Sequence, residues 1–257
     1  MLALDHLVIN TRFDTDAAQT VFEQLGFTVA PRGYHTLGSI NHAIVFGDHY
    51  LELIGLPADG KTVREEILNS PLGADGLVFR TDDPAATFAS LQQAGFEATA
   101  PQTFSRPVEC LGDARFTTVR MKPGQLDGGR VYFCQHLTPE FVFRDEWQHH
   151  PNGATSLSAL HLIDAAPEPY VQLGEIAAGF ELVYWTRKTF DEHFGAMASH
   201  IGSRGPHGPR YAGITVRTPT WQSLEQKAKT AGLPVQVDAD RVLVALPRFD
   251  TLLEFKP

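Results

Sequence analysis

The chain has 257 residues, of which 43% are hydrophobic and 20% charged, a composition typical of a soluble globular protein with one large domain or two small ones. It carries 21 basic and 30 acidic residues, a formal net charge of −9 at pH 7, and it has no Lys/Arg cluster to contact a phosphate backbone. No segment is long and apolar enough to cross a bilayer, and the N-terminus lacks a signal-peptide pattern. We therefore expect a cytoplasmic protein that binds neither nucleic acid nor membranes.

The first unit of the chain is expected to contain a strand, a helix and three more strands. Residues 4–9 form a mostly apolar run typical of a buried strand. A helix is predicted from Asp14 to Leu25, because apolar residues recur there at three- and four-residue steps before Gly26. Three further strands are expected at residues 27–30, 41–46 and 50–54.

The same order of elements begins again at Gly76. A strand is predicted at residues 76–80, a helix starts after Asp83, and strands follow at 116–121 and 130–136. Segments 22–27 and 91–96 both run from an aliphatic and polar helix end into Gly-Phe, which indicates an internal repeat of roughly 70 residues. Two such copies can close on each other to form one cupped sheet.

Two further copies follow a bridge. Residues 141–156 are polar and aromatic, contain a proline and have lost periodicity, so they predict a linker or a loop over a site. The third copy has strands at 157–163 and 181–185 but no clear third and fourth strand in 186–210, whereas the fourth copy is complete. We predict an α+β fold of tandem βαβββ modules that form cupped mixed sheets. The expected domains are a pair of modules over 1–140, the linker 141–156, and a second, partly degenerate pair over 157–257.

Two polar residues stand inside core-like strands of the first unit. His6 lies in the first strand and Glu52 in the last, and a buried carboxylate needs a hydrogen-bonding partner, a cation or a metal. The alternatives are a core histidine bonded to a backbone carbonyl and a salt bridge from Glu52 to an arginine. His161 and Glu254 take similar places in the third and fourth copies and are candidates for a second site.

These features resemble the vicinal oxygen chelate superfamily, which includes glyoxalase I and extradiol dioxygenases. The resemblance rests on Asp5-His6-Leu7-Val8 opening the first unit, on Tyr50-Leu51-Glu52-Leu53 ending it, and on the four serial units. The string from Tyr132 to Glu140, followed by His150-Pro151-Asn152-Gly153-Ala154, looks like the glyoxalase-like domain family. The resemblance implies a cup between paired units in which a divalent metal is held by His or Glu residues.

Carried over residue by residue, the resemblance implies His6 and Glu52 as metal ligands. In the second unit Gly76 stands in place of the histidine, and Phe133 or Cys134 stands in place of the glutamate. His136 could supply the missing donor, and a set of His6, Glu52 and His136 would suit Fe, Mn, Zn or Ni.

The first hypothesis is therefore a metal-dependent lyase, isomerase or dioxygenase that acts on a small oxygenated molecule. His136 would be a ligand or general base. Arg80 or Arg130 could bind a substrate carboxylate in a bidentate manner, and the alternative for either is an ion pair with an acidic residue. The rival hypothesis is a non-catalytic protein that binds a small molecule in the cup and has a degenerate metal site. Four units in one chain are compatible with either a monomer or a homodimer.

Overall fold

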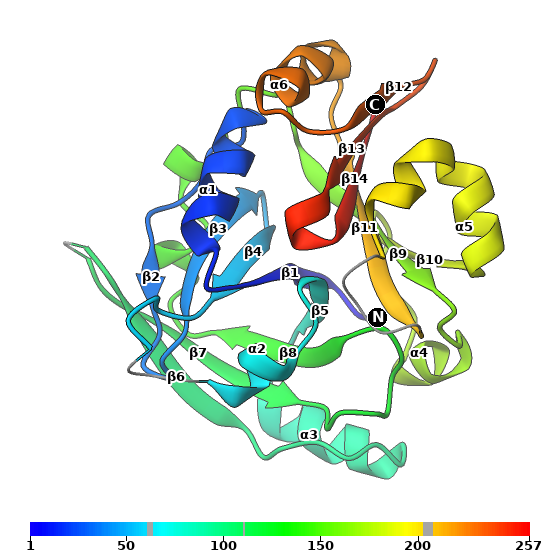
Figure 1. The fold of residues 1–257 in the computed structure, drawn as a ribbon. Helices are drawn as coiled ribbons and strands as arrows, with labels where there is room; N and C mark the ends of the chain where they lie inside the picture. Colours follow the sequence, from blue (N-terminus) through cyan, green and yellow to red (C-terminus); the bar gives the residue numbers. More distant parts are fainter. Residues whose placement is uncertain (61–63, 110, 203–207) are drawn as a thin grey trace.

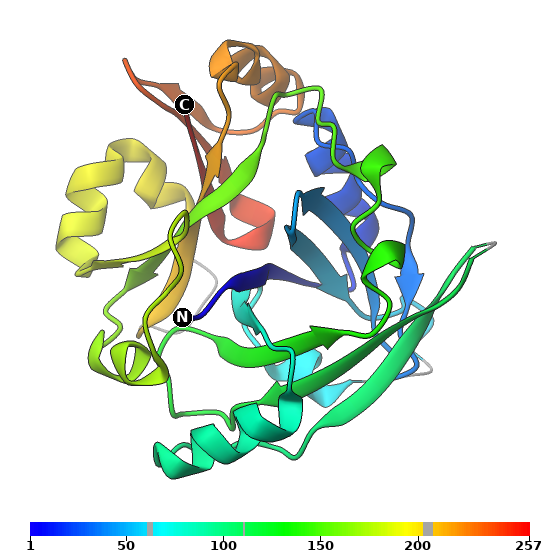
Figure 2. The same cartoon turned by 180° about the vertical axis from the view of Figure 1, so that it is seen from behind.

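The strands of the protein form two mixed sheets, one with eight strands and one with six. The computed structural model describes residues 1–60, 64–109, 111–202 and 208–257. Figures 1 and 2 show the two sheets next to each other, with helices on their outer sides. The α+β class is confirmed. In these ranges, no helix has both the length and the apolar character needed to span a membrane.

The first sheet is built from two units that repeat the same order of elements. The first unit contains β1 (Leu4–Arg12), α1 (Thr15–Gln24), β2 (Gly33–Tyr34), β3 (Ile40–Phe46) and β4 (His49–Gly55). The second contains α2 (Glu65–Asn69), β5 (Gly73–Arg80), α3 (Pro84–Gln93), β6 (Gln102–Val108), β7 (Gly112–Arg120) and β8 (Arg130–His136). The strand order is β2-β3-β4-β1-β5-β8-β7-β6, so the opening strands of both units meet at the centre. This arrangement confirms the predicted pair of βαβββ modules.

Each central strand contains one extra residue. The antiparallel pairing of β1 with β5 skips Asp5 in β1 and Asp75 in β5, so each of these residues forms a β-bulge. Each bulge directly precedes a position that matters for the site, His6 in β1 and Gly76 in β5. Because a bulge adds local twist and changes the direction of a side chain, the side chains of two consecutive residues in one strand can contact each other.

The second sheet has one complete and one incomplete unit. The third unit contains β9 (Ser156–Ile163), α4 (Glu168–Leu173), β10 (Glu181–Trp185) and α5 (Arg187–Phe194). The fourth contains β11 (Arg210–Arg217), α6 (Leu224–Thr230), β12 (Val235–Val237), β13 (Val242–Leu246) and β14 (Thr251–Lys256). Short 3-10 helices lie at Pro139–Phe141, Asp145–Trp147, Gly195–His200, Trp221–Ser223 and Pro247–Phe249.

The strand order of this sheet is β10-β9-β11-β14-β13-β12, with β10 parallel to β9. The third unit thus supplies only two of its four strands, as the weak pattern of residues 186–210 indicated; residues 203–207 of that segment lie outside the described ranges. Phe190, Phe194 and Met197 of α5 and the following 3-10 helix pack on one face of the sheet instead. That face corresponds to the open face of the first sheet.

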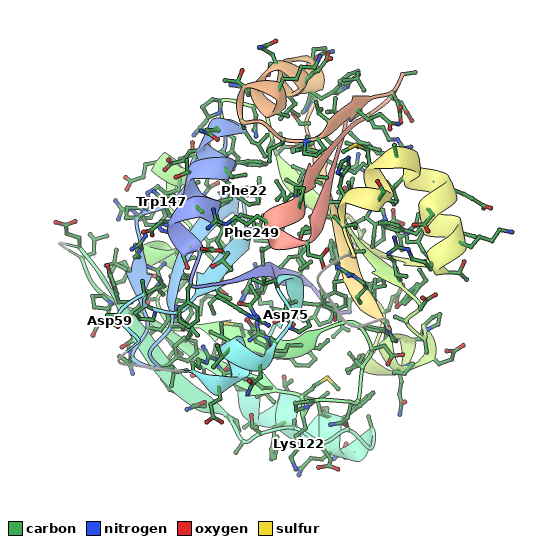
Figure 3. All side chains as sticks on the ribbon, viewed as in Figure 1. Phe22, Asp59, Asp75, Lys122, Trp147 and Phe249 are labelled. Carbon is green, nitrogen blue, oxygen red and sulfur yellow. The ribbon has the colours of Figure 1, made fainter. Side chains whose placement is uncertain are left out.

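A shared core joins the two sheets. Phe22 and Phe27 of the first unit lie in the same buried cluster as Phe249 and Phe255 of the last unit. The ring centroids of Phe27 and Phe255 are 6.1 Å apart, and Figure 3 shows Phe22 and Phe249 in the interior between α1 and the second sheet. This contact holds the base of β1 and α1 in place, and the opposite face of the first sheet stays free to form a cup.

We predict that Phe27→Ala lowers the free energy of unfolding by about 3–5 kcal/mol, because it removes a buried aromatic ring at the junction of the sheets. Chemical denaturation followed by circular dichroism measures the loss. Phe13→Ala is the matched control, since Phe13 is 48% exposed and its removal should change stability by less than about 0.5 kcal/mol. Equal effects of the two substitutions would contradict the role of this junction.

Candidate active site

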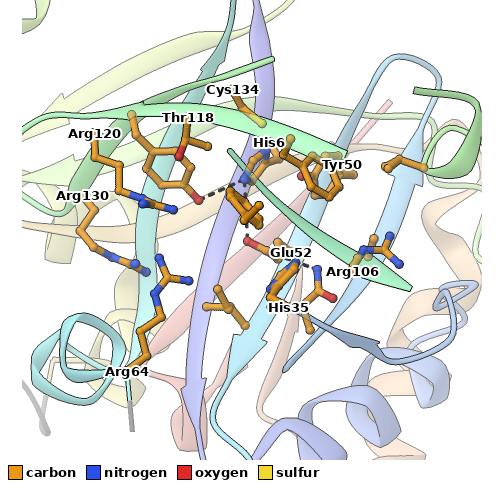
Figure 4. Close-up of a pocket in the computed structure, with 17 residues that line it drawn as sticks. His6, His35, Tyr50, Glu52, Arg64, Arg106, Thr118, Arg120, Arg130 and Cys134 are labelled. Carbon is orange, nitrogen blue, oxygen red and sulfur yellow. Dashed lines mark hydrogen bonds and ion pairs between the residues drawn. The ribbon is translucent and has the colours of Figure 1, made fainter. Parts of the chain in front are cut away.

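A pocket opens on the face of the eight-stranded sheet that points away from the shared core (Figure 4). Side chains from β1, β3, β4, β6, β7 and β8 line it. We call this pocket the first cup. Alternate residues of each strand face it, as the two-residue period of a strand requires.

Asp5 and His6 form a buried pair at the floor of the first cup. Asp5 Oδ1 lies 2.5 Å from His6 Nδ1, and the imidazole stacks on Tyr50 with ring centroids 4.3 Å apart. Burial alone would raise the pKa of Asp5, but His136 and His6 hold it well below its usual range. Since Asp5 is ionised, Nδ1–H of His6 donates to it, and Nε2 is the ring nitrogen that faces the cup.

The Nε2 atom of His6 faces two further side chains of the first cup. The Tyr132 hydroxyl lies 3.1 Å away and donates to Nε2. Glu52 Oε2 lies 3.7 Å away, a contact drawn in Figure 4. Asn41 Nδ2 donates to the other carboxylate oxygen of Glu52 at 2.7 Å. The predicted partnership of His6 and Glu52 is therefore present, with Tyr132 as a third member that the sequence did not reveal.

The two predicted catalytic residues His136 and Arg80 lie behind Asp5. His136 Nε2 is 3.0 Å from Asp5 Oδ1, and Arg80 Nε is 3.8 Å from Asp5 Oδ2. Both line a separate surface hollow with Phe143. The structure therefore brings His136 to the carboxylate that supports His6 and does not bring it to Glu52.

A pseudo-two-fold axis through the β1–β5 pair relates the first two units. Leu7 lies opposite Leu77 at its centre, so the axis superposes His6 on Gly76, as the sequence predicted. A Cβ atom on Gly76 would lie 2.6 Å from Cγ2 of Val8, so Val8 already fills that space. The second unit offers no ligand at this position.

The same axis places Tyr132 of β8 at the position of Glu52 in β4. The sequence-based assignment of Phe133 or Cys134 to this position is wrong. Periodicity shows which residues share a face but does not fix how far a strand is shifted against its neighbour. The register therefore puts a phenol where the resemblance implies a carboxylate.

One group of three potential metal donors occurs among the described residues. Asp5, Cys134 and His136 each offer an atom within 4.8 Å of the others. Burial and the nearby Asp5 and Glu52 raise the pKa of the Cys134 thiol well above its usual value. Asp5 of this group contacts His6 at Nδ1, so the group does not include the Nε2 atom that faces the cup.

Four arginines line the first cup, and the sequence pointed only to Arg130 among them, as a candidate to bind a substrate carboxylate. They are Arg64, Arg106, Arg120 and Arg130. Burial lowers the pKa of both Arg106 and Arg120. The signal that could have found Arg120 is its place in a predicted strand, whereas Arg106 lies in β6, an edge strand that contains Pro107 and lacks apolar alternation.

The second sheet does not repeat the first cup. In β9 the bulge falls at Ser158, so the next residue, Ala159, is the equivalent of His6. His161 lies two residues further along on the same face. The prediction that His161 takes the place of His6 is therefore wrong by two residues, a shift that side-chain alternation cannot reveal.

Glu254 does take the place of the β4 glutamate, as predicted. Thr215 Oγ1 lies 2.8 Å from both Glu254 Oε2 and His161 Nε2. Trp185 Nε1 donates to His161 Nδ1 at 3.0 Å, and Arg241 Nη1 lies 3.0 Å from Glu254 Oε1. These groups satisfy one another, so the network is well explained as scaffold.

Comparison with known proteins confirms the architecture. A hypothetical protein from Staphylococcus aureus is 11% identical, with a TM-score of 0.68 over 100% of both chains. A mutant of 4-hydroxymandelate synthase from Streptomyces coelicolor is 15% identical, with a TM-score of 0.58 over 99% of this chain and 92% of that one. A fusion of a xylose isomerase-like TIM barrel with 4-hydroxyphenylpyruvate dioxygenase is 13% identical, with a TM-score of 0.55 over 98% and 48%.

At such identities these structures show the fold alone, and that fold is the glyoxalase/dioxygenase fold expected from the sequence. No curated protein matches the sequence. The model of the glyoxalase-like domain matches residues 4–176, which is more than half of the chain. The matched range includes every residue that lines the first cup. The chain belongs to the glyoxalase-like domain family.

Proposed function

We propose that this chain is an enzyme that acts on a small oxygenated molecule in the first cup, where His6 transfers a proton. The observation that carries the proposal is the orientation of His6. Its Nδ1 is fixed on the buried Asp5, and its Nε2 faces Tyr132 and Glu52 inside the cup. A carboxylate that fixes the tautomer of a histidine is a recurring arrangement for a general base.

The groups present can carry out a proton abstraction next to a carbonyl. His6 Nε2 takes a proton from the substrate, and Asp5 stabilises the resulting imidazolium. The electron pair left on the substrate moves onto its carbonyl oxygen. The Tyr132 hydroxyl donates to Nε2 before substrate binds, and it turns to donate to this oxygen when the substrate takes its place at Nε2. Burial raises the pKa of Tyr132 well above its usual value, so the hydroxyl keeps its proton. Return of the proton to another atom gives an isomerase, and departure of a leaving group gives a lyase.

The divalent metal that the family resemblance implies would supply Lewis-acid catalysis when bound. Only His6 and Glu52 offer metal donors at the expected positions, because Gly76 has no side chain and Tyr132 is a protonated phenol. Catalytic zinc sites take three ligands from the protein. The expected site therefore does not fit a resident ion, and the steps above use protein groups alone.

The group of Asp5, Cys134 and His136 is the other place for such an ion. It fits poorly as well, since a thiolate is the form of cysteine that binds metal and burial keeps the Cys134 thiol protonated. Asp5 is also already bonded to both His6 and His136. Whether the activity depends on Fe, Mn, Zn or Ni is tested by adding EDTA or these metals to the exchange assay.

The rival function is non-catalytic binding of a small molecule. The observation that favours it is the loss of two of the four ligand positions, at Gly76 and Tyr132, which removes the metal chemistry of the family while the cup is kept. The two functions differ in one respect: a binding protein leaves the bonds to hydrogen in its ligand intact.

We predict that the protein catalyses exchange of protons next to a carbonyl. Protein purified without a His-tag is incubated in D2O with a panel of 2-hydroxy ketones and 2-oxo acids, and loss of the α-proton signal is followed by NMR. His6→Asn should slow exchange by about 10²–10⁴-fold, the usual contribution of a general base. His161→Asn is the matched control, because His161 is equally buried in the second sheet and should leave the rate unchanged.

Parallel samples with EDTA and with added Fe, Mn, Ni or Zn decide the role of metal. Exchange that survives EDTA supports the protein-only mechanism, and exchange that appears only with a metal contradicts it. If no compound of the panel exchanges, although one of them raises the melting temperature, the rival binding function is correct.

We also predict a pH-dependent stability defect in Asp5→Asn. The pKa of Asp5 is lower in the folded than in the unfolded protein, where the ordinary value is 3.8. Its stabilisation is therefore fully present above about pH 4–5 and is lost as the pH falls towards the folded pKa. The substitution should cost about 3–5 kcal/mol at neutral pH, as for other broken buried pairs, and less near pH 3.

Urea denaturation at about pH 7, 5 and 3 measures this effect. Asp113→Asn is the control, since Asp113 is exposed on β7 and should show no such defect. A defect of Asp5→Asn that is the same at all three pH values would contradict an ionised Asp5 in the folded protein.

A further inference from the structure

The first cup contains several buried hydrogen-bond donors that have no acceptor. The Nε atoms of Arg106 and Arg120, Nη2 of Arg130 and the hydroxyl of Thr118 all lack a partner among the described residues. All four residues line the first cup. Buried donors in folded proteins are nearly always paired, so a cluster of unpaired ones marks a place where an acceptor is missing.

Three of the arginines gather on one side of the cup. Figure 4 shows Arg64, Arg120 and Arg130 with their guanidinium groups turned towards one another, whereas Arg106 lies on the opposite side of Glu52. Arg64 and Arg130 are among the like charges that lower the pKa of Arg120, after burial as the largest cause. Like charges held together in a partly buried pocket repel one another unless an anion lies between them.

The acids nearby do not fully neutralise this group. Arg130 Nε lies 2.6 Å from Asp75 and its Nη1 lies 3.1 Å from Glu66. Arg64 Nη2 lies 3.0 Å from the same Glu66. Two carboxylates thus serve three arginines: Arg120 interacts with the charge of Glu66 at longer range but forms no ion pair of its own among the described residues.

Arg120 is positioned as a ligand-binding group. Its Nη1 donates to the neutral amide of Gln102 at 2.9 Å, and its guanidinium lies over the rings of Phe104 and Tyr132, at 5.8 and 5.9 Å from their centroids. The aromatic rings fix its plane, and its unpaired Nε is directed to the interior. A planar guanidinium held in this way is suited to a bidentate contact with an oxyanion.

We propose that the molecule bound in the first cup carries an oxyanion group, a carboxylate or a phosphate, which Arg120 and Arg130 hold. This inference rests on the proposed function and specifies the substrate class of that site. Tyr132 links the two halves, since Arg120 covers its ring and its hydroxyl contacts His6 at 3.1 Å. An anion at Arg120 therefore places the neighbouring atoms of the same molecule at His6 Nε2. Phe116 and Val142 provide an apolar wall for its body.

Titration with simple probes tests the inference. Benzoate, phenyl phosphate and the uncharged isostere benzamide are compared at equal ionic strength by calorimetry and by thermal melting. Benzoate or phenyl phosphate should bind and raise the melting temperature. Benzamide should have an affinity lower by at least roughly tenfold. The anion that binds more tightly shows whether the natural ligand carries a carboxylate or a phosphate.

Variants of β7 locate the binding group. Arg120→Met should weaken binding of the anion by roughly tenfold or more, Arg120→Lys should restore part of it, and Arg115→Gln should bind like the wild type because Arg115 is exposed on the same strand. Ligand-free Arg120→Met should melt no lower than the wild type, since the change relieves repulsion from Arg64 and Arg130. A merely structural arginine would give a lower melting temperature and unchanged anion affinity, which would overturn the inference.

Failure of this inference can be told apart from failure of the proposed function. If neither anion binds, or if benzamide binds as well as benzoate, the inference is wrong even when neutral hydroxy ketones still exchange their protons through His6. If the anions bind through Arg120 but no compound exchanges, the inference holds and the proposed catalysis is wrong. His6→Asn should keep anion binding in either case.

Discussion

The hydrogen bond between His6 Nδ1 and Asp5 Oδ1 is the contact on which the first cup depends. Neighbouring residues of a regular strand point to opposite faces, so an acid and an imidazole next to each other in sequence do not ordinarily meet. The bulge at Asp5 removes this restriction. The contact fixes the tautomer of His6, and stacking on Tyr50 fixes the plane of its ring. Together they direct Nε2 into the cup.

The second unit contains the same bulge, in which the extra residue is Asp75. There Gly76 has replaced the histidine, and Asp75 contacts Arg130 instead, at 2.6 Å. Two equivalent carboxylates thus support two different groups of one cup, an imidazole on one wall and a guanidinium on the other. The asymmetry between the units, more than their symmetry, determines what the cup can bind.

The sequence was sufficient to predict the repeat, the α+β class and the partnership of His6 with Glu52, because all three depend on periodicity and on the cost of burying a charge. It was insufficient wherever the register of two strands decides the outcome. The position of Tyr132 and the two-residue shift of His161 both follow from bulges, which leave no mark on side-chain alternation. The role of Asp5 was hidden for the same reason.

The charges of the first cup are arranged in a way that suits transfer of a proton from an anionic molecule. Asp5 and Glu52 lie on either side of His6, whereas Arg120 lies on the far side of Tyr132. A proton that moves to Nε2 therefore moves towards the carboxylates, and the negative charge left behind develops towards the guanidinium groups. In a buried pocket both interactions are stronger than in water. Tyr132 lies between the two charges, and its hydroxyl can donate a hydrogen bond to the new oxyanion without losing the proton, because burial keeps its pKa high.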